Sequence, residues 1–249
     1  FGRWLVYTAD PDANVYGGLD SGNRAVWNTG FAGLGNLTGA SGNRYVFAHQ
    51  PVLEFRSTNL SKVYGHELDA AELAAAYEVG GLHSGVQGAF LGDSLEQILA
   101  GAPEISSDGA AAAAFVKTGG YAVTIGMGSL QVSGGYGVDF DSSGVLTITP
   151  ADLKVTVDDA SRTYGAVDPE FTASAEGLME WDEAWFASEL ELTTDATQQS
   201  DVGEYGITAS LESGNYTITF VDGKLTITPA ALTVKANDAI RTYGEETPE

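Results

Sequence analysis

The chain has 249 residues, and 34 acidic side chains outnumber 11 basic ones to give a formal net charge of −23. This charge excludes binding to nucleic acids and to anionic lipid surfaces, because both require clustered basic residues. No apolar run approaches the ~20 residues that cross a bilayer, so we expect no membrane insertion. The composition predicts a folded, strand-rich protein, and the lack of cysteine leaves its compartment open.

Residues 1–51 are predicted to form a short β-rich segment. Residues 2–7 predict a first strand. The phrase Ser-Gly-Asn-Arg occurs at 21–24 and again at 41–44, each time before a short aromatic run. Turns of this composition that lead into aromatic runs are typical of strands. The spacing of 20 residues (41 − 21) is also the size of one β-helix coil.

Residues 52–151 are predicted to form a first repeat. Apolar and polar residues alternate over 52–57, which indicates a strand. The alanine-rich stretch 69–77 predicts a short helix, and Ser94-Leu95-Glu96-Gln97 has the form of a capping box before another helical turn. Further strands are predicted at 121–125, 136–140 and 145–149.

Residues 152–230 are predicted to form a second repeat. Its first strand alternates from Leu153, and residues 180–190 predict a helix. Two alternating runs, 216–221 and 224–228, flank Asp222-Gly223. This pattern predicts a β-hairpin with a type I′ turn, in which both turn residues need positive φ.

Long phrases recur at a fixed spacing. LKVTVDDASRTYG at 153–165 returns as LTVKANDAIRTYG at 232–244, an offset of 79 residues (232 − 153), and LTITPA at 146–151 returns at 225–230. Units of this size bury their own core, so the repetition predicts tandem domains rather than solenoid coils. Residues 231–249 are then the start of a third repeat, and we expect the sequence to be a piece of a longer protein.

A Tyr-Gly pair marks each repeat, at Tyr64-Gly65, Tyr164-Gly165 and Tyr243-Gly244. We interpret the pair as structural, with a buried ring whose hydroxyl bonds to a turn and a glycine that permits a left-handed backbone. A binding role for the tyrosines is the alternative.

Motifs for catalysis are missing from the sequence. His49, His66 and His83 stand alone, and we expect each at the surface or in a turn. There is no nucleophile elbow, no P-loop and no thiol. The sequence therefore predicts a protein that is not an enzyme.

Calcium is the one cofactor that the sequence suggests. Asp158, Asp159 and Asp238 place carboxylates near repeat boundaries, where a hard cation would stiffen the chain. The stretch 139–144 resembles half of an EF-hand loop, but Pro150 stands where the bidentate glutamate is needed, so a hairpin loop is favoured.

Two tryptophans are the best candidates for ligand binding. Trp181 and Trp185 stand at helical spacing, with Asp182 between them. Together they suit a platform for stacking a sugar. Packing in the core is the alternative for the two rings.

The repeated phrases, and GNYTITFVDGKLTITPA at 214–230, resemble the YGX-type MBG repeats of large bacterial exoproteins. Residues 2–55 resemble the segment after the β-helix in filamentous-haemagglutinin-like adhesins of two-partner secretion systems. The first repeat departs from the pattern: it is longer, and reads Ser-Lys-Val-Tyr-Gly at 61–65 where the second reads Ser-Arg-Thr-Tyr-Gly.

The resemblance implies a mainly β (α+β) fold of tandem β-grasp-like domains, each with a mixed sheet and one short helix. It also implies a secreted adhesin at the bacterial surface or in the extracellular matrix, often tied to biofilm, with no catalytic residues.

Two functions stay open. The chain is either a stalk that holds an adhesive region away from the cell, or itself a module that binds glycans or mucin. Its expected partners are polysaccharide, mucin or neighbouring adhesin chains.

Overall fold

The computed structural model describes residues 3–32 and 41–246, so residue 2 of the first predicted strand and residues 247–249 of the third repeat lie outside the described residues. The chain divides into two compact units, Phe1–Ala151 and Asp152–Glu249. No helix in the described part is long and apolar enough to cross a membrane.

The N-terminal residues of the first unit form a small parallel stack. Strand β1 (Leu5–Thr8) runs parallel to β2 (Arg44–Phe47), and Val26 makes a parallel bridge to Val46. The side-chain amide of Asn23 donates to the carbonyl of Asn43 (3.2 Å). The two Ser-Gly-Asn-Arg phrases, 20 residues apart in sequence, therefore lie side by side.

The rest of the first unit contains two main sheets. One has the order β12-β3-β5 and the other β4-β13-β10-β9. Both are mixed, because β12–β3 and β4–β13 are parallel pairs and the other pairs are antiparallel. The bounds are β3 (Val52–Ser57), β4 (Leu60–Val63), β5 (Tyr77–Gly80), β9 (Glu104–Ser106), β10 (Tyr121–Gly126), β12 (Gly137–Asp141) and β13 (Gly144–Thr149).

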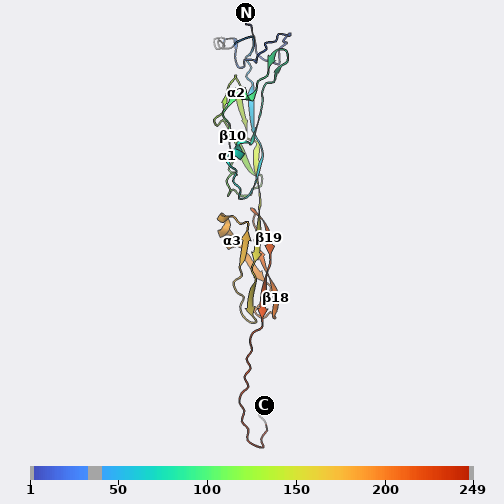
Figure 1. Cartoon of the computed structure of the whole chain (residues 1–249), viewed down its shortest axis with the longest axis vertical. Coiled ribbons are helices and arrows are strands. Elements are labelled where there is room, and N and C mark those ends of the chain that lie inside the picture. The colour runs from blue at the N-terminus through green and yellow to red at the C-terminus, as the bar shows by residue number, and fades with distance from the viewer. Residues whose placement is uncertain (1–2, 33–40, 247–249) are drawn as a thin grey trace. The chain divides into compact units, whose positions relative to one another are not determined.

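Short elements elaborate this unit (Figure 1). They are α1 (Ala70–Ala74), β6 (Gly85–Val86), β7 (Phe90–Leu91), α2 (Leu95–Ile98), β8 (Leu99–Ala100) and β11 (Gln131–Val132). Helix α1 has a true capping box, formed by Asp69 and Glu72. The helix predicted after Ser94 is present as α2, but the predicted capping box is wrong, because the Ser94 side chain makes no capping hydrogen bond.

The second unit repeats the order of the two main sheets. Its sheets are β16-β14-β19 and β15-β20-β18-β17. The strands of the two units correspond one to one. Strands β12, β3 and β5 match β19, β14 and β16, and strands β4, β13, β10 and β9 match β15, β20, β18 and β17. The bounds are β14 (Ala151–Val157), β15 (Ala160–Thr163), β16 (Ala173–Glu176), η2 (Glu180–Asp182), α3 (Glu183–Glu189), β17 (Glu191–Thr194), β18 (Gly203–Ser210), β19 (Tyr216–Val221) and β20 (Gly223–Thr228).

The predicted mainly-β architecture with mixed sheets and few short helices is confirmed. One detail differs, since each unit divides its main strands between two sheets. The predicted helix at 180–190 is present as η2 followed by α3.

The predicted β-hairpin at Asp222-Gly223 is wrong. Strands β19 and β20 belong to different sheets, and neither turn residue has a positive φ. The glycine serves close packing instead, because a Cβ on Gly223 would lie 2.6 Å from the carbonyl oxygen of Asp158. Gly144 makes the same crossing in the first unit, where a Cβ would lie 2.5 Å from the carbonyl oxygen of Thr58.

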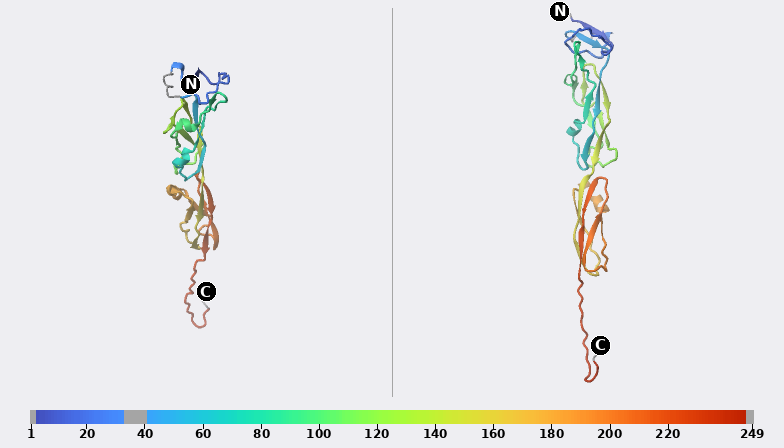
Figure 2. Two further views of the ribbon diagram at one scale, coloured as in Figure 1. Left: turned by 45° about the horizontal axis from the view of Figure 1, so that its top comes forward. Right: turned by 90° about the vertical axis from the view of Figure 1, so that its right-hand side faces the viewer.

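The N-terminal stack shares its core with the first repeat. Trp27, Tyr45 and Phe47 pack in one buried cluster with Leu53 and Phe55. In both views of Figure 2 the stack, coloured blue, lies at one end of the unit. Residues 1–51 and 52–151 therefore fold together.

Residues 229–246 follow β20 without forming a strand or helix. Leu232 and Val234 are exposed there, whereas Leu153 and Val155, which occupy the same places in the second repeat, are fully buried.

Candidate functional site

Each Tyr-Gly pair forms the same tight turn. The N–H after the glycine donates to the carbonyl before the tyrosine, from His66 to Val63, from Ala166 to Thr163 and from Glu245 to Thr242. The three glycines have φ values of 90°, 81° and 91°. A positive φ at this position is what a type II turn requires and glycine allows. The turn forms even in the exposed C-terminal segment, so it is a local property of the sequence.

The predicted burial of the tyrosine ring holds for one pair only. Tyr64 is 1% exposed, but Tyr164 is 45% exposed and Tyr243 is fully exposed. The backbone N–H groups of Tyr64 and Tyr164 bond equivalently, to Thr149 and Thr228. The motif thus preserves the turn and its backbone pairing rather than a buried aromatic ring.

A buried cation lies two residues before each of the first two Tyr-Gly pairs. The ammonium of Lys62 donates to the carbonyls of His66 (2.8 Å), Ala110 (3.1 Å) and Ala111. Burial lowers the pKa of Lys62. Its counterpart Arg162 pairs with Asp168 and donates to the carbonyl of Thr197 (2.6 Å).

Sequence reasoning missed these cations. The available signal was the basic residue two places before the tyrosine in all three copies, at Lys62, Arg162 and Arg241. Lys62 and Arg162 each connect their Tyr-Gly turn to a distant loop, so we assign them a structural role in the repeat.

The predicted ligand-binding residues lie at the start of α3. Trp181 is 48% exposed. Trp185 is half-buried and stacks on Tyr216, with ring centroids 5.8 Å apart and planes 8° apart. Asp182 accepts a 2.6 Å hydrogen bond from the Tyr216 hydroxyl. Of the three residues, Trp181 presents the most open side chain.

The first unit contains the same tyrosine–aspartate contact. The Tyr136 hydroxyl donates to Asp93 (2.8 Å), which precedes α2, and burial raises the pKa of Tyr136. Asp93 also accepts from the indole N–H of Trp27 (2.8 Å). In both units a backbone N–H donates to the tyrosine, from His83 or from Met179. The signal in the sequence was Ser-Gly-Gly-Tyr at 133–136 and Ser-Gly-Asn-Tyr at 213–216.

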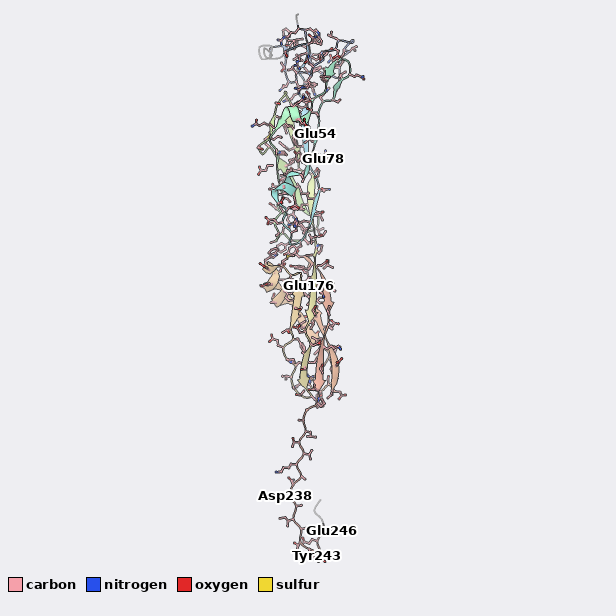
Figure 3. The ribbon with its side chains drawn as sticks, in the orientation of Figure 1. Glu54, Glu78, Glu176, Asp238, Tyr243 and Glu246 are labelled. Atoms are coloured by element: carbon pink, nitrogen blue, oxygen red, sulfur yellow. The ribbon has the colours of Figure 1, made fainter. Side chains whose placement is uncertain are left out.

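The three aspartates proposed for calcium have separate places. Asp158 accepts from the Thr172 hydroxyl (2.7 Å), and Asp159 accepts from the Lys224 N–H (2.8 Å). Asn59 accepts equivalently from Val145 N–H (2.9 Å), so this position caps the strand after the sheet crossing. Asp238 is exposed in the C-terminal segment (Figure 3). Calcium binding stays a prediction; no metal-binding group of three or more His, Cys, Asp or Glu side chains occurs among residues 3–32 and 41–246.

The outer face of β12-β3-β5 is acidic. Glu54 and Asp139 stand directly across from each other, and like charges so placed repel. Arg56 bonds to Asp141 (2.8 Å), and Glu78 lies opposite Arg56. Figure 3 marks Glu54 and Glu78 on this face. Asp139 and Asp141 belong to β12, and β12 and β13 lie in different sheets, so the hairpin loop predicted at 139–144 is wrong.

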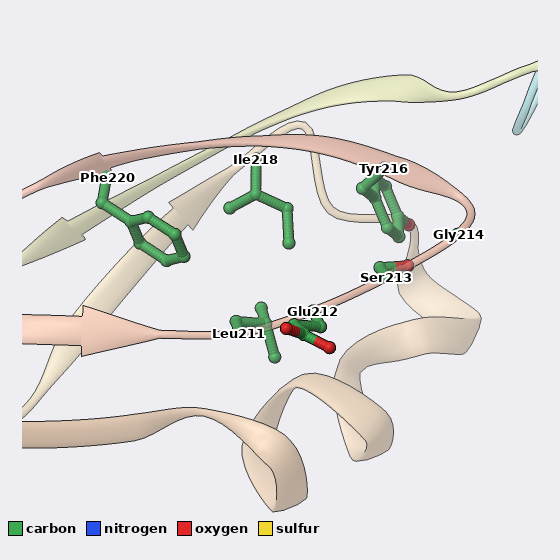
Figure 4. Close-up of a pocket in the computed structure, with 7 residues that line it drawn as sticks. All are labelled: Leu211, Glu212, Ser213, Gly214, Tyr216, Ile218 and Phe220. Carbon is green, nitrogen blue, oxygen red and sulfur yellow. The ribbon is translucent and has the colours of Figure 1, made fainter.

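A hollow of about 550 Å³ opens in the second unit. It lies between β19 and the segment that follows β18, near the helix (Figure 4). Tyr216, Ile218 and Phe220 project from β19 toward Leu211. The lining residues are Leu211, Glu212, Ser213, Gly214, Tyr216, Ile218 and Phe220. The hollow is shallow and largely open to solvent.

Residues 153–226 match the MBG domain (YGX type). The match begins in β14 and ends in β20, so it covers the two sheets of the second unit. The chain therefore contains a YGX-type MBG domain, which points to a repeat module of an adhesin-like protein. No curated protein sequence matches the chain.

Proposed function

We propose that this chain is a non-catalytic stalk region of a secreted bacterial surface adhesin, in which tandem repeats hold an adhesive region away from the cell. The observation that carries the proposal is the recurrence of one strand order. The first unit contains β12-β3-β5 with β4-β13-β10-β9, and the MBG domain repeats both orders. A stalk is built by adding copies of one such unit.

Details of the two units support tandem repetition. Gly81 and Gly177 both have positive φ, and a Cβ on either would collide with a carbonyl, of Val52 and Asp152 respectively. One residue, Pro150, separates β13 from β14. A connection that short, with proline, limits swivelling between neighbouring repeats. The net charge of −23 disfavours collapse of neighbouring chains onto one another.

The parallel stack at the N-terminus supports the finer part of this proposal, a two-partner-secreted, haemagglutinin-like adhesin with a role in adhesion or biofilm. Its two Ser-Gly-Asn-Arg phrases stand 20 residues apart, and the chain after them pairs in parallel through Val26 and Val46. Stacking of this kind is how coils of a β-helix associate.

The stalk proposal is tested by small-angle scattering of the chain at moderate salt. A control carries six Gly-Ser residues inserted after Pro150. We expect a narrow distribution of end-to-end distances for the natural chain and a broader one for the control. Identical distributions would contradict a stiff stalk.

A second candidate function is binding of a glycan or mucin by the module itself. The observation that favours it is the hollow beside α3, together with Trp181, 48% exposed, on the adjoining turn. A glycan array probed with and without calcium tests this function. A saturable signal supports the binding module, and a blank array from folded protein removes it. The comparison of the calcium and chelator arms tests the calcium prediction.

A further inference from the structure

The hollow in the second unit has a counterpart in the first that is filled. Three residues of the first unit occupy places equivalent to lining residues of the hollow. Leu130 and Tyr136, which precede β12, correspond to Leu211, before β19, and Tyr216, at its start. Phe140 corresponds to Phe220. Leu130, Tyr136 and Phe140 all pack in or against the aromatic core of the first unit. The open space is therefore particular to the second unit and is not inherent in the fold.

The core of the second unit is built from smaller side chains than the aromatic core of the first. Comparison of the strand registers in the two units makes three positions equivalent: Phe55 and Val155, Tyr77 and Ala173, and Ile125 and Ala209. At each of the three, the second unit has the smaller side chain. Phe55 packs on Tyr77 (centroids 6.0 Å apart) and on Phe140 (5.6 Å). Phe220, the counterpart of Phe140, is 36% exposed.

Polar and apolar groups share the lining of the hollow. Phe220, Ile218 and Leu211 supply an apolar wall, and the Phe220 ring faces the open space (Figure 4). Glu212 supplies a carboxylate at the side, and Ser213 adds a hydroxyl. Tyr216 is held in place by Asp182 and by stacking with Trp185. The site thus combines the exposed Phe220 ring with hydrogen-bonding groups.

We propose that this hollow is a carbohydrate subsite that holds one non-anionic sugar residue. This inference rests on the second candidate function and gives that function a location. The C–H face of a sugar packs against Phe220, and its hydroxyls donate to Glu212. Aromatic contact and a few placed polar groups are the usual means of orienting a small ligand in a pocket.

The charge around the hollow selects against anionic sugars. Glu212 lies in the lining, and Glu180 and Glu183 lie on η2 and α3 beside it. A carboxylated or sulfated sugar would meet like charges and lose its hydration without a cationic partner. Neutral hexoses and acetylated amino sugars meet no such penalty.

Titration calorimetry and saturation-transfer NMR of the whole chain test the subsite. The probes are cellobiose, maltose, lactose and diacetylchitobiose, with sialyllactose as the anionic comparator. Phe220→Ala removes the wall, and Val221→Ala, at the next and also exposed position of β19, is the matched control.

We expect one neutral probe to bind. Phe220→Ala should weaken it about tenfold or more, and Val221→Ala should not. Glu212→Gln, which leaves the apolar wall in place, should weaken it less. Binding that survives Phe220→Ala but is lost in Trp181→Ala would overturn the subsite and leave the glycan function standing. Failure of every saccharide to bind would overturn both and leave the stalk untouched.

Discussion

The hydroxyl of Tyr216 donates a 2.6 Å hydrogen bond to Asp182, which joins the first residue of β19 to the start of α3. Tyr136 makes the equivalent bond to Asp93 in the first unit (2.8 Å). In each unit this contact ties a strand of the three-stranded sheet to the short helix. Asp182, which the sequence suggested as a sugar ligand, is therefore also part of the repeated architecture.

Tyr216→Phe should destabilise the second unit by about 1–3 kcal/mol, because Asp182 loses a donor while it stays partly buried. Chemical denaturation followed by Trp185 fluorescence measures the loss. Tyr205→Phe is the control, since the Tyr205 hydroxyl donates to the backbone carbonyl of Asp201 at an exposed site. Equal losses in the two variants would contradict a special role for the Tyr216 contact.

Gly223→Ala should destabilise the second unit by roughly 1–3 kcal/mol, through overpacking where the chain crosses between the sheets. The new Cβ would lie 2.6 Å from the Asp158 carbonyl oxygen. Gly206→Ala is the matched control, because no atom lies within 4 Å of a Cβ there. Thermal unfolding of both variants measures the difference, and a Gly223→Ala protein as stable as Gly206→Ala would contradict the close packing at this crossing.

Arg162→Met should cost about 3 kcal/mol of stability, the lower end for breaking a buried ion pair. The Arg162 side chain is 3% exposed, but that of Asp168 is 30% exposed and regains water. Lys154→Met, at an exposed pair with Glu176, should cost less than about 1 kcal/mol. Denaturant midpoints of the two variants test the contrast.

The first unit should lose stability as the pH falls below about 6.5, the ordinary pKa of histidine. Burial lowers the pKa of His83, even though Asp12 and Asp93 oppose the shift and His49 adds to it. The neutral ring accepts from the Gly85 N–H (3.0 Å) and packs on Trp27. Because the folded state disfavours the protonated ring, its contribution is complete above pH 6.5 and declines on acidification. His83→Gln should flatten this dependence in unfolding curves taken between pH 5 and 8, whereas His66→Gln should not.

Local signals in the sequence predicted local structure well. Tyr-Gly specified a turn with positive φ in all three copies, and alternation located β3 and β14. Asp222-Gly223 misled, because the same dipeptide serves a hairpin and a crossing between sheets. The choice depends on partners distant in sequence, here the backbone at Asp158.

The buried groups were harder to predict for the same reason. The sequence suggests that Lys62 is a surface residue, but in the folded chain its ammonium donates to three carbonyls from two loops. The walls of the hollow come from β19 and the segment after β18, which only the folded chain brings face to face. Tyr136 and Tyr216 were visible as a repeated phrase, but their aspartate partners lie 43 and 34 residues away.

The central claim is that one fold occurs twice, and cross-strand NMR contacts test it most directly. We predict parallel contacts between Leu60–Val63 and Leu146–Thr149, and the same pattern between Ala160–Thr163 and Leu225–Thr228. Antiparallel contacts between β19 and β20 across Gly223, or a first unit without the β4–β13 pair, would contradict it.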